Sequence, residues 1–577
     1  MAIEHYDYDV LVLGSGGSGL RAAVAAAEAG AHTGLVCKSL LGKAHTVMAE
    51  GGLAASLGNV APEDNWGIHF QDTMFGGKYL NNWRMAELHA KEAPDRAREL
   101  EHWGAVFDRT PERVMSQRAF GGHTYKRLVH IGDRTGLEMI RTLQDKAVHS
   151  AIDVFMEATI TRLIKDGERV VGCFGYRRAT GEQISFSAKA LIVATGGSGR
   201  IYKITSNSQD CTGDGYALAY EAGAELVDME FVQFHPTGMV YPPGVAGLLV
   251  TEAVRGEGGI LRNKDGERFM ERYDPKRMEL STRDVVARSI YTEVKEGRGT
   301  PHGGAYLDVS HLDSEYVKKK LPSMYDQFLE LAGVDITKEP MQVGPTCHYF
   351  MGGIKVEADT GATRVPGLYA TGEASGGMNG ANRLGGNSLG DLLVFGRRAG
   401  IGAAEIASQS APVSLPADEV AAAQAEVDRF LNGSGTENPF QMHKDLQKIM
   451  GDGAGIFRDK EGLSDAITQL EGLEGRVGNL RSPTNRLDYN PAWQLCREVK
   501  NMLTVSLMIA RAALMREESR GGHSRLDYTD YSDYWGGHNI VIHRDRDDDM
   551  TLTPTPVVIC DELAELVEAR KESEKAA

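Results

Sequence analysis

The stretch "YDVLVLGSGGSGLRAAVAAAEAGA" (residues 8–31) decides the fold. An apolar run ends in a glycine cluster, and an alanine-rich run follows, which predicts a strand, a tight turn and a helix. Gly14, Gly16 and Gly19 form the pattern G-x-G-x-x-G in this strand-to-helix context. Glycines at these positions let the backbone approach a pyrophosphate at the helix N-terminus. The stretch therefore predicts a Rossmann-like nucleotide-binding domain, with a purely structural glycine turn as the alternative interpretation.

The second predicted strand bears on which nucleotide binds. NAD-binding folds usually place Asp or Glu about 20 residues after the glycines, where the carboxylate holds the ribose. Here the stretch "HTGLVCKSL" (32–40) ends in Cys37, Lys38 and Ser39 instead. This departure counts against an NAD dehydrogenase and leaves a flavin open as the cofactor.

Two later stretches look like further pieces of the same fold. "KALIVATGGSGRIY" (189–202) reads as a buried strand that runs into a Gly-Gly turn. "VPGLYATGEASGGMNGANRLGGNSLGDLLVFGRRAG" (365–400) reads as a strand, a glycine-rich loop and a helix. Because the strands of one nucleotide fold return near residue 370, a second domain must be inserted between them. We predict an α/β protein with an FAD-binding domain in two parts (1–231 and 354–412), an inserted α+β capping domain (232–353), a helical domain (413–530) and a small C-terminal domain (531–577).

Composition narrows the functional class. With 577 residues and 68 glycines the chain is long enough for several domains. Its formal net charge of -17 argues against a nucleic-acid partner, which would require clustered Lys and Arg. We expect no secretory signal at the N-terminus and no membrane-spanning segment, since no unbroken apolar run reaches about 18 residues. The six cysteines are scattered without a C-x-x-C pair, so we expect a reducing compartment and neither a zinc site nor an iron–sulfur cluster in this chain.

Polar residues cluster beside glycine and proline around the predicted insertion. Two histidines and two arginines near one flavin would make a site for a small dianion, because the planar guanidinium donates two parallel hydrogen bonds to a carboxylate. Each residue also has a structural interpretation, such as a core histidine or a surface Glu–Arg pair. We expect the set to lie in glycine-rich or proline-flanked loops: His235, Thr251, Glu252, Arg255, Arg283, His348 and Arg383.

The chain resembles the flavoprotein subunit of succinate dehydrogenase and fumarate reductase over nearly its whole length. Ten motifs carry the resemblance in order: "GSGGSG", "AHTVMAEGG", "ATGGSGR", "TGDG", "FVQFHPTG", "TEAVRGEGG", "RDVVARS", "PTCHYFMGG", "GANRLGGNSL" and "ESRGGHSR". The resemblance implies an enzyme of respiratory complex II that interconverts succinate and fumarate. We expect succinate oxidation in the tricarboxylic acid cycle, with fumarate reduction as the alternative direction.

The resemblance also implies how the cofactor is held. In that family the histidine of an H-T-x-x-A-x-G-G motif carries FAD covalently, through a ring nitrogen joined to the 8α carbon of the flavin. His45 matches this position, with Thr46, Ala49, Gly51 and Gly52 in register. The expected cofactor-binding residues are Gly14, Ser15, Gly16, Gly17, Ser18, Gly19, Lys38, Ser39, His45, Thr46, Gly51, Gly52, Ala194, Thr195, Gly196, Gly197, Asp214, Glu373, Arg383, Ser388 and Leu389.

Catalytic roles follow from the same resemblance. His235, Thr251, His348 and Arg383 are expected to bind the two carboxylates of succinate or fumarate, with Phe120 beside them. Arg283 matches the proton donor and acceptor of the family, and Glu252 and Arg255 the relay to solvent. Arginine is an awkward base because it normally stays charged, but a neighbouring carboxylate can return its proton.

Partners and alternatives complete the expectation. Electrons from the reduced flavin must leave, so we expect a separate iron–sulfur subunit, together with a membrane anchor that exchanges with quinone, with or without haem. The chain would then lie peripherally on the cytoplasmic face of the membrane. L-aspartate oxidase and a soluble fumarate reductase are the alternatives, but His45 argues against both. A non-catalytic FAD-binding scaffold would not need His235, Arg283, His348 and Arg383. Glu50, which replaces a glutamine found in some succinate dehydrogenases, is a hint of the reductive direction.

Overall fold

The predicted strand, glycine turn and helix lie at the centre of a seven-stranded sheet. The computed structural model describes residues 3–545, 547 and 549–576, so residues 1–2, 546, 548 and 577 of the predicted domains lie outside the description. The strand order is β6-β2-β1-β9-β8-β7, with β16 pairing with β9. Parallel pairs join β6, β2, β1, β9 and β16, and antiparallel pairs join β9, β8 and β7. The strands are β1 (Glu4–Leu13), β2 (Thr33–Val36), β6 (Ile152–Phe155), β7 (Ala158–Asp166), β8 (Arg169–Arg177), β9 (Gln183–Val193) and β16 (Leu368–Ala370).

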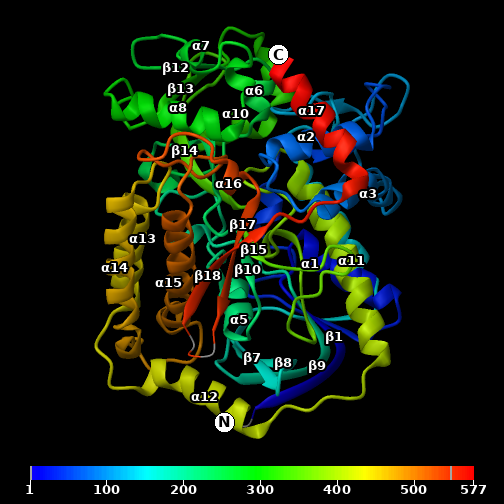
Figure 1. Cartoon of the computed structure of the whole chain (residues 1–577), viewed down its shortest axis with the longest axis vertical. Helices are drawn as coiled ribbons and strands as arrows, with labels where there is room; N and C mark the ends of the chain where they lie inside the picture. The colour runs from blue at the N-terminus through cyan, green and yellow to red at the C-terminus, as the bar shows by residue number, and fades with distance from the viewer. Residues whose placement is uncertain (1–2, 546, 548, 577) are drawn as a thin grey trace.

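Two helices separated widely in sequence pack together on this sheet. They are α1 (Gly17–Glu28) and α11 (Asn387–Gln409), and they lie side by side in Figure 1. Their contact is close because a Cβ at Gly400 would meet Ala22 O at 2.3 Å. The strand β16 adds to the sheet just before α11 begins. Residues near 370–400 therefore complete the fold that begins at residue 4.

A second sheet lies between β9 and β16 in the chain. It is antiparallel, with the order β11-β14-β13-β12. Helix α8 (Arg283–Lys295) packs on β11 and β14. This second sheet and the helices around it form the upper part of the molecule in Figure 1. Its strands are β11 (Val232–Met239), β12 (Ile260–Arg262), β13 (Ala305–Asp308) and β14 (Met341–Phe350), and its other helices are α6 (Ala253–Gly256), α7 (Met270–Tyr273), α9 (Ser314–Lys320) and α10 (Pro322–Ala332).

Four helices lie within residues 413–530, where the apolar periodicity predicts helices. They are α12 (Ala417–Asn432), α13 (Pro439–Gly453), α14 (Lys460–Glu474) and α15 (Pro491–Met515). The last three have N-cap side chains that accept from first-turn N–H groups. Helix α15 is buried along most of its length and joins the core of the sheet, where Trp493 stacks on Tyr176 with ring centroids 4.2 Å apart.

The C-terminal segment returns to the body of the molecule. Strands β17 (His538–Arg544) and β18 (Met550–Pro556) form a hairpin that pairs with β10 (Leu226–Val227), and β10 pairs with β15 (Gly353–Ile354). The final helix α17 (Ala564–Ala576) packs on α2 (Trp66–Gly76). The remaining elements are α3 (Trp83–His102), α4 (Thr135–Val148), α5 (Asp214–Glu221), α16 (Asp533–Gly536) and a small sheet of β3 (Leu53–Ala54), β4 (Gln117–Arg118) and β5 (Leu128–Val129).

Among the residues that the structure describes, none of the helices combines the length and apolar character needed to cross a membrane.

The contact between α15 and the sheet should carry much of the stability of the helical segment. Trp493 is 2% exposed, and its indole N–H donates to Val427 O at 3.0 Å. We expect Trp493→Ala to lower the free energy of unfolding by about 3–5 kcal/mol, because it leaves a cavity and an unpaired carbonyl. Guanidinium unfolding followed by circular dichroism measures this. Trp66→Ala, at a position 36% exposed, should cost less than about 1 kcal/mol. Equal losses of stability in the two variants would show that the contact of Trp493 with the sheet contributes nothing special to stability.

Candidate functional site

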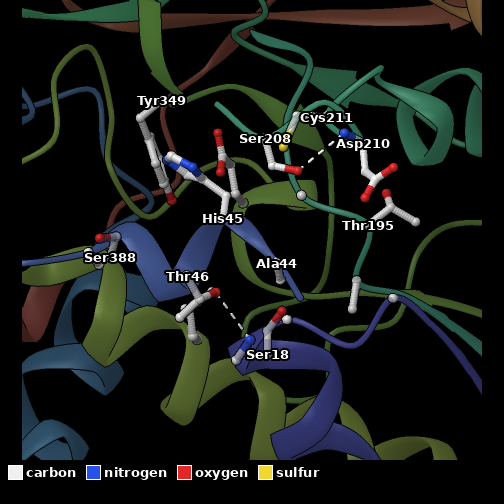
Figure 2. A pocket seen from close by; sticks show the side chains of 18 of the residues that line it. Ser18, Ala44, His45, Thr46, Thr195, Ser208, Asp210, Cys211, Tyr349 and Ser388 are labelled. Atoms are coloured by element: carbon white, nitrogen blue, oxygen red, sulfur yellow. Dashed lines mark hydrogen bonds between the residues drawn. The ribbon is translucent and has the colours of Figure 1, made fainter. Parts of the chain in front are cut away.

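A single cavity brings together the predicted cofactor-binding and substrate-binding residues. It contains about 1600 Å³ of space, including its opening to solvent. Its walls come from the glycine turn, the ends of β2, β9 and β16, the 43–52 loop and the second sheet; Figure 2 shows side chains of this lining. The lining includes the predicted residues Gly14, Ser15, Gly16, Gly17, Ser18, Lys38, Ser39, His45, Thr46, Gly51, Gly52, Phe120, Ala194, Thr195, Gly196, Asp214, His235, Thr251, Glu252, Arg283, His348, Glu373, Arg383, Ser388 and Leu389.

Three predicted site residues stand behind the cavity wall. A Cβ at Gly19 would lie 1.8 Å from Gly14 O, so Gly19 allows the helix to approach the strand. A Cβ at Gly197 would lie 2.4 Å from Glu373 Oε1, so Gly197 makes room for that carboxylate. Arg255 lies behind Glu252, where Nη1 donates to Glu279 O at 2.6 Å. These three residues do not line the cavity; each packs against or supports a residue that does.

The glycine turn suits the phosphate groups of a dinucleotide. Helix α1 begins after Gly16, and its N-terminal N–H groups favour an anion. Gly17 N donates to Thr46 Oγ1 at 3.2 Å, which fixes the 43–52 loop against the start of the helix. Gly196, with φ +76°, has open space within 4 Å of where its Cβ would be. A bulky polar ligand can therefore reach the backbone on both sides of the cavity.

Lys38 lines the cavity and forms buried ion pairs with two carboxylates. Its ammonium group lies 2.8 Å from Asp214 Oδ2 and 2.7 Å from Glu498 Oε1. Burial disfavours its charge, but the two carboxylates outweigh burial and raise the pKa of Lys38. For Asp214, burial is likewise outweighed by Lys38, so its pKa is lowered. Lys38 thus joins the end of β2 to α5 and α15.

His45 begins a short 3-10 helix, His45–Met48, at the middle of the cavity. Asn207 Nδ2 lies 3.3 Å from His45 Nε2, and Nδ1 is buried without a hydrogen-bond partner among the described residues. Burial and then Arg383 lower the pKa of His45 to about 4. The imidazole is therefore neutral at pH 7, so a ring nitrogen has a lone pair available for bonding.

Two more histidines continue from His45 into the second sheet. The ring centroids of His45 and His348 are 5.7 Å apart, and those of His348 and His235 are 5.1 Å apart. Burial, with nearby arginines, lowers the pKa of both His235 and His348 well below the ordinary value. Ser206 Oγ lies 2.8 Å from His348 Nδ1 and Thr237 O lies 3.0 Å from His235 Nδ1. These contacts orient both rings and leave each Nε2 as the remaining polar atom.

The prediction that these histidines lie in loops is wrong. His235 lies within β11 and His348 within β14, and the two strands pair with each other. Proline normally ends a ladder because it has no N–H. Here the register shifts between His235 and Gly238, where Pro236 stands. The irregularity accommodates the proline without ending the strand, so the sheet itself holds the two rings.

Arg283 begins α8 and forms a buried chain of charges with two neighbours. Arg283 Nε donates to Glu252 Oε2 at 2.8 Å, and Arg255 Nη2 lies 3.6 Å from the same oxygen. Burial opposes ionisation of Glu252, but Arg283 and then Arg255 outweigh it and lower its pKa. Glu252 Oε1 also accepts from Gly121 N at 2.9 Å. The carboxylate is therefore charged and fixed between two guanidinium groups.

Arg383 approaches the same place from the glycine-rich loop before α11. Its guanidinium stacks on the Tyr349 ring, 4.1 Å from the centroid, and donates to Ser388 Oγ. Its Nε is buried and finds no hydrogen-bond partner within the described part of the chain. Burial and then Arg283 lower the pKa of Arg383 to about 10. A carboxylate in the cavity would supply both the missing acceptor and the missing negative charge.

Gln233 is a buried residue that holds two arginines of the site and that the sequence analysis did not single out. Its Oε1 accepts from Arg283 Nη1 at 3.2 Å and from Arg383 Nη2 at 2.9 Å. Its amide donates to Asn382 Oδ1 at 2.9 Å and to Arg383 O at 2.8 Å. One side chain therefore holds the two arginines at a fixed separation. The motif "FVQFHPTG" contains it two residues before His235, so the alternation of a strand is the signal that could have found it.

Several residues that line the cavity were not among the predicted site residues. Ser208, Asp210 and Cys211 come from the loop before α5, where Asp210 N donates to Ser208 Oγ at 3.2 Å (Figure 2). Tyr349 lies one residue after His348 yet also lines the cavity, because the sheet is irregular there. Glu50 lines it too, and burial followed by Asp133 raises its pKa well above the ordinary value. Of these residues only Glu50 could have been predicted from the sequence, because it lies in the same motif as His45.

Two protein families match this chain. The family described as "FAD binding domain" matches residues 9–389, and the one described as "Fumarate reductase flavoprotein C-term" matches residues 443–571. A protein of Methanothermobacter marburgensis that is named as part of a fumarate reductase (CoM/CoB) is 47% identical, over 94% of this chain and 98% of the relative. A Coxiella burnetii succinate dehydrogenase flavoprotein subunit is 39% identical, over 93% and 95%.

Solved structures are similar over nearly the whole chain. The Mycobacterium smegmatis Sdh1 complex in the apo form contains a chain 50% identical, with a TM-score of 0.88 and coverage of 99% of this chain and 98% of that one. A variant of Escherichia coli quinol fumarate reductase is 35% identical, with a TM-score of 0.92 and coverage of 97% and 98%. The likeness of fold therefore extends over both sheets and the helical segment.

Gln233 offers a test of the site geometry that needs no substrate. Gln233→Leu removes the oxygen that accepts from Arg283 and Arg383, so two buried guanidiniums lose an acceptor. We expect the free energy of unfolding to fall by roughly 3 kcal/mol. Gln409→Leu, at an exposed position near the end of α11, should change it by less than about 0.5 kcal/mol. Denaturant unfolding of both variants measures the difference; equal stability would show that the shared acceptor is unimportant.

Proposed function

The chain belongs to the family of succinate dehydrogenase and fumarate reductase flavoprotein subunits, and from this premise we propose that it interconverts succinate and fumarate, with succinate oxidation as its direction. It is an oxidoreductase whose cofactor is FAD. One observation carries the proposal: Arg283, with its carboxylate partner Glu252, lies beside Arg383 and the two neutral histidines in the cavity that also contains His45. A binding scaffold would not need this buried charge.

The residues of the cavity fit FAD. The Gly16 turn suits its pyrophosphate, and Glu373 at the end of β16 suits a hydroxyl-bearing chain, since burial raises its pKa to about 7 and lets it donate or accept a hydrogen bond. FAD, when bound, supplies the centre that accepts or donates a hydride. We propose that His45 carries it covalently through a ring nitrogen. The orphaned Nδ1 and the neutral ring support a bond at His45.

Substrate binding rests on charge and shape. Arg383, His235, His348 and Thr251 would hold the two carboxylates of succinate or fumarate. The histidines are neutral, so they act as hydrogen-bonding groups, and the positive charge comes from Arg383 and Arg283. Phe120 packs against Gly385, where a Cβ would lie 2.3 Å from its ring, and so closes one side of the site. A buried dianion would balance the two arginines that now meet at Gln233.

Proton transfer would use the buried chain of charges. In fumarate reduction Arg283 would donate a proton to one substrate carbon while the other carbon receives the hydride. A proton that reaches the Glu252 carboxylate from solvent, past Arg255, would then pass to Nε of Arg283, 2.8 Å away. In succinate oxidation the proton moves the other way. Arg255 stands behind Glu252, and its Nε and Nη2 are buried with no hydrogen-bond partner in the described residues. Ordered water at these N–H groups would extend the relay.

Electrons require partners. Within the described residues there is no group of three or more His, Cys, Asp or Glu side chains that could hold a metal ion. We propose that an iron–sulfur subunit receives electrons from the flavin and passes them to a membrane anchor, with or without haem, that exchanges with quinone. The similar Mycobacterium smegmatis Sdh1 has been solved in complex with UQ1, which supports this arrangement. The chain would lie peripherally at the cytoplasmic face of the membrane.

Fumarate reduction is the second candidate for the physiological direction. Glu50 stands at a position where some fumarate reductases carry glutamate, and it lines the cavity. The 47%-identical relative is named a fumarate reductase. Initial rates of the assembled complex in both directions, with quinone and with quinol, decide between the two; a larger rate for fumarate would reverse our choice.

The covalent link has a direct test. We expect the purified chain to give a band on a denaturing gel that fluoresces under ultraviolet light after acid treatment. His45→Ser should give a dark band and release FAD into the supernatant, because serine offers no ring nitrogen. A dark wild-type band would move the chain towards the relatives that hold FAD without a covalent bond.

The proposed role of Arg283 in proton transfer can be tested by substitution. Arg283→Lys should lower turnover at least about a thousandfold while FAD remains bound, because the amine cannot reach Glu252 and the substrate together. Arg262→Lys, at a partly exposed position in the same segment, should keep nearly full activity. Steady-state succinate oxidation and flavin absorbance measure both effects. Activity retained in Arg283→Lys would overturn the role.

A further inference from the structure

A second cluster of buried charges lies outside the cavity. Arg127 is fully buried, and its guanidinium donates to Asp64 at 2.7 and 3.1 Å. The same group lies 2.9 Å from Asp72 Oδ2, and Asp72 is also fully buried. Arg570, from the C-terminal helix α17, lies 3.3 Å from Asp72 Oδ1. Two carboxylates thus meet two guanidiniums, and one of the four comes from the far end of the chain.

The cluster holds one short loop. Asp72 accepts from Thr124 N at 2.7 Å and from Thr124 Oγ1 at 2.6 Å. Arg570 Nη1 donates to the same hydroxyl at 3.3 Å. Arg127 Nη1 lies 3.4 Å from His123 Nδ1. The end of the 120–124 loop is therefore tied to the cluster by both its backbone and its side chains.

The other end of this loop is part of the candidate active site. Phe120 lines the cavity. Gly121 N donates to Glu252 Oε1 at 2.9 Å. His123 Nε2 donates to Gly385 O at 2.8 Å, two residues after Arg383. A shift of the loop would therefore move the wall of the cavity, the carboxylate that pairs with Arg283 and the segment that carries Arg383.

Helix α17 is packed where it can exert this effect. Figure 1 shows it beside α2, the helix that carries Asp72, and the two are in contact. Val567 and Leu563 are buried against Phe70 and Met74. Arg570 lies one turn beyond Val567 and is largely buried, with its guanidinium 4.8 Å from the Phe75 ring centroid. Apolar packing therefore fixes the direction from which Arg570 reaches Asp72.

We propose that Arg570 is a positioning residue of the active site, and that docking of the C-terminal helix sets the 120–124 loop in its working geometry. The physical reason is the cost of unbalanced buried charge. Without Arg570 the cluster keeps two carboxylates and one guanidinium, so Asp72 would turn towards other donors and its two bonds to Thr124 would weaken. The inference rests on the proposed function only for its kinetic consequence.

The test compares three variants of the full chain in its assembled complex. Arg570→Gln removes the charge, Arg570→Lys restores it, and Lys571→Gln is the matched control because Lys571 pairs with Glu568 on its own helix, 2.8 Å away. Hydrogen–deuterium exchange reports the loop without reference to any substrate. We expect peptides covering residues 118–127 to exchange about tenfold faster in Arg570→Gln and at the wild-type rate in Lys571→Gln.

Kinetics give the second readout. We expect Arg570→Gln to lower kcat for succinate and raise KM, each by about tenfold, with flavin content unchanged. Arg570→Lys should recover most of both. Unchanged exchange of the 118–127 peptides, or unchanged kcat and KM beside faster exchange, would overturn the inference. If the wild-type chain does not act on succinate or fumarate, the proposed function fails and exchange alone decides this inference.

A variant that fails to fold does not end the test. Thr124→Val keeps all four charges and removes the hydroxyl that bonds to Asp72 and Arg570. If the geometry of the loop matters, Thr124→Val shows the same rise in KM and fall in kcat with normal flavin content. Wild-type kinetics in a folded Thr124→Val, beside an unfolded Arg570→Gln, would show that Arg570 serves stability alone and would refute the proposal.

Discussion

Close backbone approach at the glycine turn is the constraint on which the rest of the structure depends. A Cβ at Gly14 would lie 2.3 Å from Ala194 O, and one at Gly19 would lie 1.8 Å from Gly14 O. With φ +110° at Gly14, the chain turns from β1 into α1 without a side chain in the way. Strands β1 and β9 and helix α1 therefore meet within van der Waals contact. The cavity opens at this meeting point, because parallel strands end together there.

Electrostatics inside the cavity follow from burial. Burial keeps His45, His235 and His348 neutral, and it lowers the pKa of Arg383 while a second guanidinium lies nearby. The free protein tolerates two adjacent arginines because Gln233 accepts from both and Glu252 pairs with one. A dicarboxylate would complete this balance. In the proposed function, the same positive charge that Gln233 and Glu252 stabilise would also select a dicarboxylate.

Residues remote in sequence support the site through similar buried charges. Lys38 joins the end of β2 to α5 and α15 through Asp214 and Glu498. Arg570 joins the last helix to α2 through Asp72. Breaking a buried pair is costly because the remaining partner keeps its charge in a poorly solvated place. The helical and C-terminal segments therefore contribute buried charges, Glu498 and Arg570, to ion pairs with residues of the FAD-binding domain.

The sequence by itself determined the strand–turn–helix core, the return of the fold near residue 370 and most of the cavity lining, because these depend on local rules of glycine geometry and periodicity. Through the family resemblance of its motifs it also predicted His45, Arg283 and Arg383 as site residues, and all three line the cavity. Only the tertiary structure decided that His235 and His348 stand in paired strands, that Arg255 lies behind Glu252, and that Gln233 joins two arginines. Such contacts link residues 50 to 150 positions apart, and no local pattern encodes which side chains a folded sheet will bring within 3 Å of each other.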